Sequence, residues 1–256
     1  VRGLLDTYNR NVAGQRLLVR GLSPELMQAV SVQRLDFSTT TSRAARMLLM
    51  LPIFLLMSTF VGGMNVAIDV TAGERERVSL ESLLVHPVSR LSLVAGKWGA
   101  ATLLNFAVVF LTLAVSVAVL NSPKLQSLEL RIGLGVDEAL AALALLVPLV
   151  LFGPAIQMLI STFARSFKEA QTYLSLLILL PALPGFFFAF QTAKPEPWMD
   201  RIPLLGHQTL ITTALRGESL GFANPALLAA ATVIAALLCI VVTGRLLQDE
   251  RIVLTR

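Results

Sequence analysis

The chain has 256 residues, of which 55% are hydrophobic and 14% are charged, and its mean hydropathy is +0.74. A soluble domain usually carries about 25% charged residues, so the composition indicates a membrane protein and excludes an ordinary soluble domain. The net charge of +5 is typical of Lys and Arg in loops beside anionic lipid. With one cysteine and two histidines, we expect no intrachain disulfide and no metal site within one copy.

The first 46 residues are polar, and five uncharged runs of at least 20 residues follow them. Each run is long enough to cross the hydrocarbon core as a helix. None alternates in polarity with period two, as barrel strands do. We therefore expect an all-α fold, a polytopic transmembrane helical bundle with five spans in this chain. The expected spans are 47–68, 98–123, 139–164, 170–193 and 219–244.

The segments between these spans alternate between the two sides of the membrane. One side carries 12 Lys and Arg residues and the other carries nine, but the comparison becomes five against nine without residues 1–46. Long segments largely ignore the positive-inside rule, so charge counts alone leave the orientation open. The first side comprises 1–46, 124–138 and 194–218, and the second comprises 69–97, 165–169 and 245–256.

Segment 69–97, "DVTAGERERVSLESLLVHPVSRLSLVAGK", is the most polar long stretch between two spans. Asp69 directly follows the first span and is expected to mark its exit. Thr71 and Glu74 have the spacing of a capping box, which predicts a new helix start. An apolar stripe at i, i+3 and i+4 follows, and Pro87 ends the helix. The residues alone leave two interpretations open, a solvated interfacial helix or an element that docks a cytoplasmic partner.

This segment resembles the signature of type-2 ABC exporter permeases, in particular the NatB-type sodium-efflux group. It departs from the family pattern at Val78, where Gly is usual, and at Ser79, where Thr is usual. We expect neither change to alter function, because Ser keeps the hydroxyl and Val has a low cost in a helix. The matching positions are Asp69, Ala72-Gly73-Glu74-Arg75-Glu76, Leu80-Glu81, Leu83-Leu84, Pro87, Arg90 and Gly96-Lys97.

The resemblance implies six spans, with a large external domain between the first two. The five runs then correspond to spans two to six of a permease domain over 47–246, and residues 1–46 end the external domain. This agrees with the topology, because five spans place the chain ends on opposite faces and a polar leading segment is hard to export without an earlier span. Segment 69–97 becomes a cytoplasmic segment with an amphipathic coupling helix, 194–218 an external re-entrant or interfacial loop, and 247–256 a cytoplasmic tail.

The resemblance also implies a permease subunit of an ATP-driven exporter in a bacterial or archaeal plasma membrane. Gly96-Lys97 lacks the other residues of a Walker sequence, so we expect ATP and Mg²⁺ on a separate ABC ATP-binding subunit and no cofactor on this chain. The other partners are a second permease copy or related permease and membrane lipid, with no nucleic acid. The expected docking residues are Glu74, Arg75, Glu76, Arg77, Leu80, Glu81, Leu83 and Leu84, supported by Asp69, Gly73, Pro87, Arg90, Gly96 and Lys97.

Two other functional classes are alternatives to a permease. An intramembrane enzyme needs paired ionisable or nucleophilic groups, and the expected spans contain no acid, base or histidine, so no catalytic residue is assigned. The composition does not exclude a non-transporting scaffold or a passive channel. The cargo is also open: sodium rests on the resemblance alone, and drugs, lipids or peptides are the alternative. The polar residues proposed for a transport path are Asn65, Asn105, Gln157 and Thr162.

Overall fold

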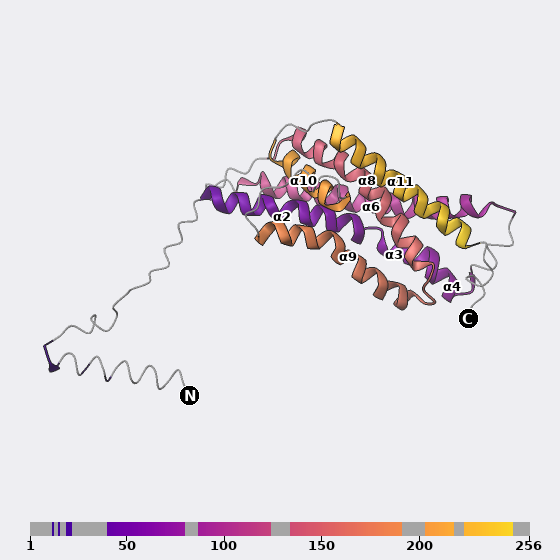
Figure 1. Cartoon of the computed structure of the whole chain (residues 1–256), viewed down its shortest axis with the longest axis horizontal. Helices are drawn as coiled ribbons and strands as arrows, with labels where there is room; N and C mark the ends of the chain where they lie inside the picture. The colour runs from indigo at the N-terminus through magenta and orange to yellow at the C-terminus, as the bar shows by residue number, and fades with distance from the viewer. Residues whose placement is uncertain are drawn as a thin grey trace. The chain divides into compact units, whose positions relative to one another are not determined.

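The computed structural model describes residues 12, 15, 19–21, 40–79, 87–123, 134–190, 203–217 and 223–247. Residues 1–38 and 39–256 form separate compact units, and every helix named below belongs to the second. Within the described ranges this unit consists of helices and turns (Figure 1). The elements are α2 (Thr40–Val61), α3 (Met64–Ile68), η2 (Asp69–Gly73), α4 (Glu74–Glu76), α6 (Arg90–Leu120), α8 (Val136–Ser161), α9 (Phe167–Phe190), α10 (Pro203–Leu215) and α11 (Ala223–Leu246).

The long helices lie side by side, as in an antiparallel bundle (Figure 1). Four stretches in the described chain are long and apolar enough to cross a membrane: Met50–Glu76, Arg90–Leu120, Val136–Ser161 and Pro225–Leu246. The other expected span, 170–193, falls on α9, and its last three residues lie outside the described ranges. The all-α transmembrane bundle expected from the sequence is therefore confirmed.

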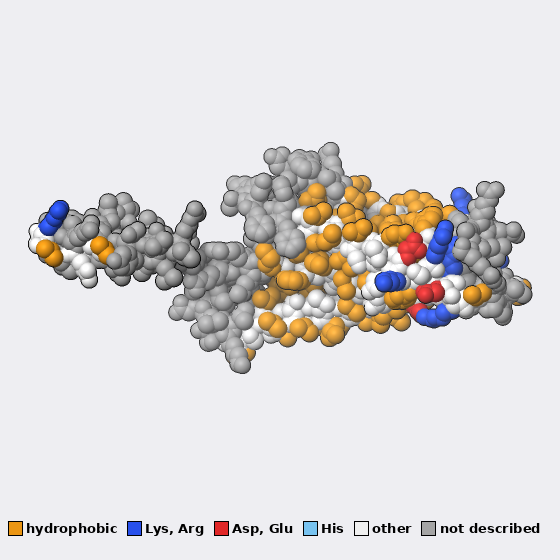
Figure 2. All heavy atoms as spheres, turned by 90° about the horizontal axis from the view of Figure 1, so that it is seen from below, with side chains coloured by type: hydrophobic (Ala, Val, Ile, Leu, Met, Phe, Trp, Pro, Cys, Tyr) orange, Lys and Arg blue, Asp and Glu red, His pale blue; other side chains and the backbone are white. Residues whose placement is uncertain are grey.

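The outer surface of the bundle is apolar. Large side chains such as Leu103 and Leu111 of α6 and Leu227 of α11 are more than half exposed. Figure 2 shows apolar side chains across the visible face of the bundle, with charged side chains gathered toward one end of it. Such a surface would be a liability in water, but in a bilayer it meets lipid, where helices satisfy their own backbone hydrogen bonds.

Helix α10 packs near the end of the bundle opposite the charged segment at α4 (Figure 1). Its Ile211 and Leu215 join a buried cluster with Leu51 of α2 and Leu146 of α8. At 13 residues, α10 is too short to span a bilayer, as expected for the uncharged stretch within 194–218. Burial lowers the pKa of the His207 imidazole in this helix, so the ring stays neutral near pH 7.

Candidate functional site at the charged end of the bundle

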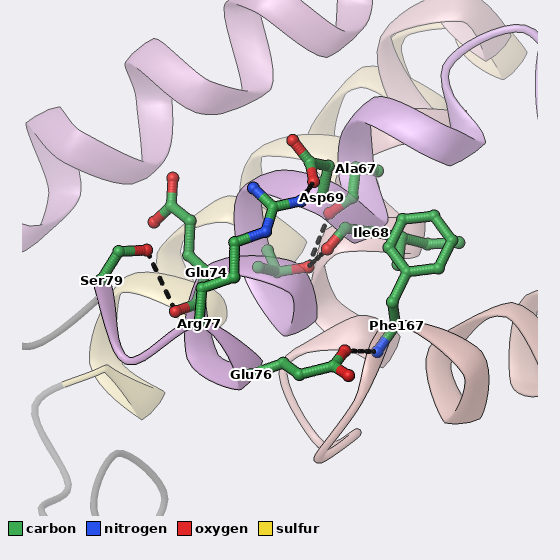
Figure 3. A network of polar contacts seen from close by, with 9 residues as sticks. Ala67, Ile68, Asp69, Glu74, Glu76, Arg77, Ser79 and Phe167 are labelled. Carbon is green, nitrogen blue, oxygen red and sulfur yellow. Dashed lines mark hydrogen bonds and ion pairs between the residues drawn. The ribbon is translucent and has the colours of Figure 1, made fainter.

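The charged motif does not begin a new helix; it continues the first span. Asp69–Gly73 is a π-helical turn, and the residues that flank it, Ile68 and Glu74, both have helical dihedral angles. The Thr71 hydroxyl donates to the Ala67 carbonyl at 2.6 Å, one turn back (Figure 3). The predicted capping box at Thr71 is therefore wrong, because the helix that contains the first span continues to Glu76. The hydroxyl bonds the carbonyl of an unbroken helix instead of a free N–H. The exit of the span from the membrane at Asp69 stays a prediction.

The helix ends just after this motif. The Arg77 N–H donates to Gly73 O at 3.1 Å, and Val78 then takes a φ of +58°. A β-branched residue is strained in this left-handed region, which glycine adopts readily. The expectation that Val78 has a low cost is therefore wrong, because the position is not helical. The rest of the predicted amphipathic helix, including Leu80, Glu81, Leu83 and Leu84, lies outside the described residues and stays a prediction.

Glu74 joins the motif to α6. Its carboxylate forms an ion pair with Lys97, whose Nζ also donates to Val70 O at 2.8 Å. The Glu74 and Lys97 side chains are only 20% and 10% exposed, so the pair lies where water screens charge poorly. Removing one partner would leave the other charge mostly buried and unpaired, which is strongly destabilising.

Arg75 and Glu76 contact two further helices. The Arg75 Nη1 donates to Thr162 O and Ala164 O, both at 3.2 Å, where α8 has just ended. Glu76 Oε2 accepts the Phe167 N–H at 2.7 Å, at the start of α9 (Figure 3). Both contacts suit the helix dipole, because a cation lies at a C-terminus and an anion at an N-terminus. Two adjacent residues thus bond the end of one helix and the start of the next.

The remaining charges at this end are more exposed. Arg77 pairs with Asp69, but their side chains are 62% and 47% exposed, so this ion pair adds little stability. Glu169 accepts the Arg165 N–H at 2.7 Å and the Tyr173 hydroxyl at 2.5 Å. The hydrogen bond from Tyr173 holds the pKa of the Glu169 carboxyl below its usual range. Of the four described docking candidates, only Glu76 and Arg77 are exposed, and the docking role stays a prediction.

The other motif residues have different surroundings. A Cβ on Gly73 would lie 3.0 Å from Asp69 Oδ1, whereas a Cβ on Gly96 would meet nothing within 4 Å. Pro87 is exposed in the turn that leads to Ser89, whose hydroxyl caps α6 by accepting the Ser92 N–H at 3.1 Å. Arg90 is half-buried as the first residue of α6. The motif therefore has one tightly packed glycine, Gly73, and further along the chain a capped start of α6.

Asn105 and Gln157, proposed for the transport path, bond backbone carbonyls at breaks in neighbouring helices. Asn105 Nδ2 donates to Thr59 O at 2.9 Å and to Val150 O at 3.2 Å. Gln157 Nε2 donates to Phe60 O. The Thr59 and Phe60 carbonyls are among the last of α2, which ends at Val61. The Val150 carbonyl has no helical donor because residue 154 is proline.

Three glycines allow this close crossing of α2, α6 and α8. A Cβ on Gly62 would lie 2.6 Å from Asn105 Oδ1, and one on Gly63 would lie 3.1 Å from Ala101 O. A Cβ on Gly153 would penetrate the Thr59 carbonyl oxygen. Small residues at such contacts let membrane helices approach closely. The signals in the sequence were the Gly62-Gly63 pair and Pro154, which mark places where carbonyls need a side-chain donor.

The four residues proposed for a path do not form one cluster. Asn65 is exposed on α3, and Thr162 donates to Met158 O at 2.8 Å at the end of α8. Asn105 and Gln157 lie near the break in α2, each fully buried with a side-chain carbonyl oxygen that has no partner among the described residues. The described residues contain no group of three or more His, Cys, Asp or Glu that could hold a metal ion. A path through all four stays a prediction.

The chain has long apolar helices, a cluster of charged side chains that links helices at one end, and buried amides at helix breaks. These features define an integral membrane protein of the helical-bundle class. The chain matches the family model described as "ABC-2 family transporter protein" over residues 13–246. It is 34% identical over 194 residues to "ABC transporter permease protein NatB" of Bacillus subtilis (strain 168), covering 73% of this chain and 49% of that protein. The chain therefore belongs to the ABC-2 family of transporter proteins, which confirms the resemblance.

The chain spans about half the length of this relative. No solved structure matches this chain. The arrangement of the helix bundle and of its charged end therefore rests on this chain alone. The activity of a whole transporter is a proposal.

Proposed function

We propose that this chain is the membrane-spanning permease subunit of an ATP-driven exporter. ATP hydrolysis takes place on a separate ABC ATP-binding subunit, which docks on the charged end of the bundle. A second permease copy or a related permease completes the pathway. The orientation follows from this proposal: the end that carries the motif faces the cytoplasm of a bacterial or archaeal cell.

One observation supports this function above the others: three consecutive residues of the motif contact three different helices. Glu74 pairs with Lys97 of α6, Arg75 bonds the end of α8, and Glu76 bonds the start of α9. A partner that displaces α4 would therefore move α6, α8 and α9 together. Coupling of ATP hydrolysis to transport requires such a link, because each state must make different contacts with the partner.

The test measures ATP turnover of the partner ATPase reconstituted with this permease in vesicles. Glu76 is exposed and bonds α9, so Glu76→Lys removes that bond and reverses the charge that a docking partner would meet. We expect permease-stimulated turnover to fall at least tenfold, a loss of about 1.4 kcal/mol of coupling, with membrane insertion unchanged.

The matched control is Asp137→Lys. This exposed acid lies in the first turn of α8, at the opposite end of the bundle. It introduces the same change of charge far from the motif and should leave turnover near that of the unaltered chain. Equal turnover in the Glu76→Lys variant and in the unaltered chain would reject the coupling role.

The cargo is the second part of the proposal. Sodium is the first candidate, on family resemblance, and amphiphilic drugs, lipids or peptides are the second. The same vesicles, loaded with sodium or with a fluorescent amphiphile, compare the two directly. ATP-dependent movement of one cargo identifies it as the substrate. Flux that is independent of ATP would instead indicate a passive channel.

A further inference from the structure

A small pocket opens between five elements at the charged end of the bundle. Residues of η2 and α4, the N-terminal part of α6, and the C-terminal parts of α8 and α11 line it. Its cavity volume is about 20 Å³, enough for about one water-sized group. Two cations, Arg75 and Lys97, are among the lining residues, with no acid. The remaining lining residues are four hydroxyl residues, Thr71, Ser161, Thr162 and Thr243, and apolar side chains.

Two hydrogen-bond donors on residues that line this pocket have no acceptor among the described residues. They are Arg75 Nε and Ser161 Oγ, both shielded from solvent. Ser161 has no exposed surface at all. Buried donors are nearly always satisfied, and each exception needs an explanation, such as a bound water or ion. The other three hydroxyls already donate to carbonyls of their own helices.

The charge balance around the pocket favours an anion. Lys97 has a carboxylate partner in Glu74, which is not a lining residue. The hydrogen bonds of Arg75 go to the neutral carbonyls Thr162 O and Ala164 O, and no carboxylate of the described residues forms an ion pair with it. No ion pair among the described residues therefore neutralises its guanidinium charge. An anionic oxygen would satisfy both the charge and the two donors.

The position of the pocket points to a lipid as the source of that oxygen. The charged side chains lie toward one end of the apolar surface (Figure 2), which is the depth of lipid headgroups. Basic pockets between membrane helices are known to bind anionic headgroups. The apolar lining residues, such as Val94, Met158 and Leu247, suit the glycerol and upper acyl chain of a lipid at the pocket mouth.

We propose that this pocket binds the phosphate of an anionic phospholipid, with one phosphate oxygen between Arg75 Nε and Ser161 Oγ. The rest of the headgroup stays at the open mouth, because the cavity admits only one water-sized group. The bound lipid then joins the ends of α4 and α8, where Arg75 already bonds the Thr162 and Ala164 carbonyls. This inference does not depend on the transport proposal, since it concerns binding by the chain alone.

The test titrates the purified full chain in neutral detergent with short-chain phosphatidylglycerol, phosphatidylcholine or inorganic phosphate and follows thermal unfolding. We expect phosphatidylglycerol to raise the midpoint in a saturable way, as a ligand of the folded state does, and the other two probes to raise it far less. Ser161→Ala removes one hydrogen bond to a charged group and should weaken the apparent Kd about tenfold.

Two further variants make the result specific. Ser161→Asp places a carboxylate in the pocket and should abolish the response to phosphatidylglycerol. The control, Thr112→Ala on α6, removes a hydroxyl that bonds Val108 O at 2.7 Å within its own helix and should keep the full response. An equal response to inorganic phosphate would reassign the pocket to a free anion. A full response in Ser161→Ala, or no response in the unaltered chain, would overturn the site.

Discussion

Asn105 gives the sharpest test of how the bundle is held together. Its amide donates to two buried carbonyls, Thr59 O and Val150 O, and neither of these has its usual helical donor. Asn105→Leu keeps a similar volume but removes both hydrogen bonds. Each carbonyl left unsatisfied costs about 1 to 3 kcal/mol in a protein interior. Interhelical hydrogen bonds in membranes are weaker, at most about 1.7 kcal/mol.

Two carbonyls at about 1 to 1.7 kcal/mol each predict a loss of about 2 to 3.4 kcal/mol in the free energy of unfolding. The measurement is unfolding of the purified chain in mixed micelles with increasing dodecyl sulfate, followed by circular dichroism. Ser116→Ala is the control on the same helix, because its hydroxyl bonds Thr112 O within α6 at 2.7 Å. That variant should change stability by less than about 0.5 kcal/mol.

A double-mutant cycle separates the two carbonyls. Pro154→Ala restores an N–H that can donate to Val150 O within α8. In that background Asn105→Leu should cost about 1 to 1.7 kcal/mol less than in the unaltered chain, because only Thr59 O then loses its donor. A coupling energy near zero, or a single-variant loss no larger than that of Ser116→Ala, would refute the role of Asn105 as a donor to broken helices.

Two substitutions of glycine test the close helix crossing. Gly153→Ala should destabilise the chain by about 1 to 3 kcal/mol, because its Cβ meets the rigid Thr59 carbonyl, whereas Gly96→Ala, in open space within α6, should stabilise it by up to about 1 kcal/mol. The same unfolding assay checks both, and equal effects would show that the crossing is not tight. Val78→Gly should raise the unfolding midpoint and increase the free energy of unfolding by about 1 kcal/mol, because φ is +58° at this position. A lower midpoint would mean that Val78 is not strained.

The apolar runs predicted the bundle well because transfer into lipid is a sum over many side chains. Charges are so costly in hydrocarbon that 20 uncharged residues are enough to indicate a span. The motif around Glu74 predicted the family for a different reason, since it is a specific order of residues. Its local structure was predicted less well. The spacing of Thr71 and Glu74 suits a capping box, but the same hydroxyl bonds a preceding carbonyl when the helix continues.

The roles of Asn105 and Gln157 also lay beyond sequence reasoning. An amide in an apolar run is equally compatible with a transport path and with a structural contact. Pro154 and the Gly62-Gly63 pair indicated where carbonyls lose their donors, but not which side chain would reach them. That depends on the close crossing of α2, α6 and α8, which places an amide of one helix beside the breaks in the other two.

The sequence by itself determined that the chain is a helical membrane protein and which family it belongs to. These properties depend on composition and residue order, which are local. The tertiary structure alone decided that Glu74 pairs with Lys97 and that Arg75 bonds α8, across 23 and 87 residues of chain. Such contacts depend on the depth and rotation at which each helix packs, and those are set by side-chain fit between helices distant in sequence.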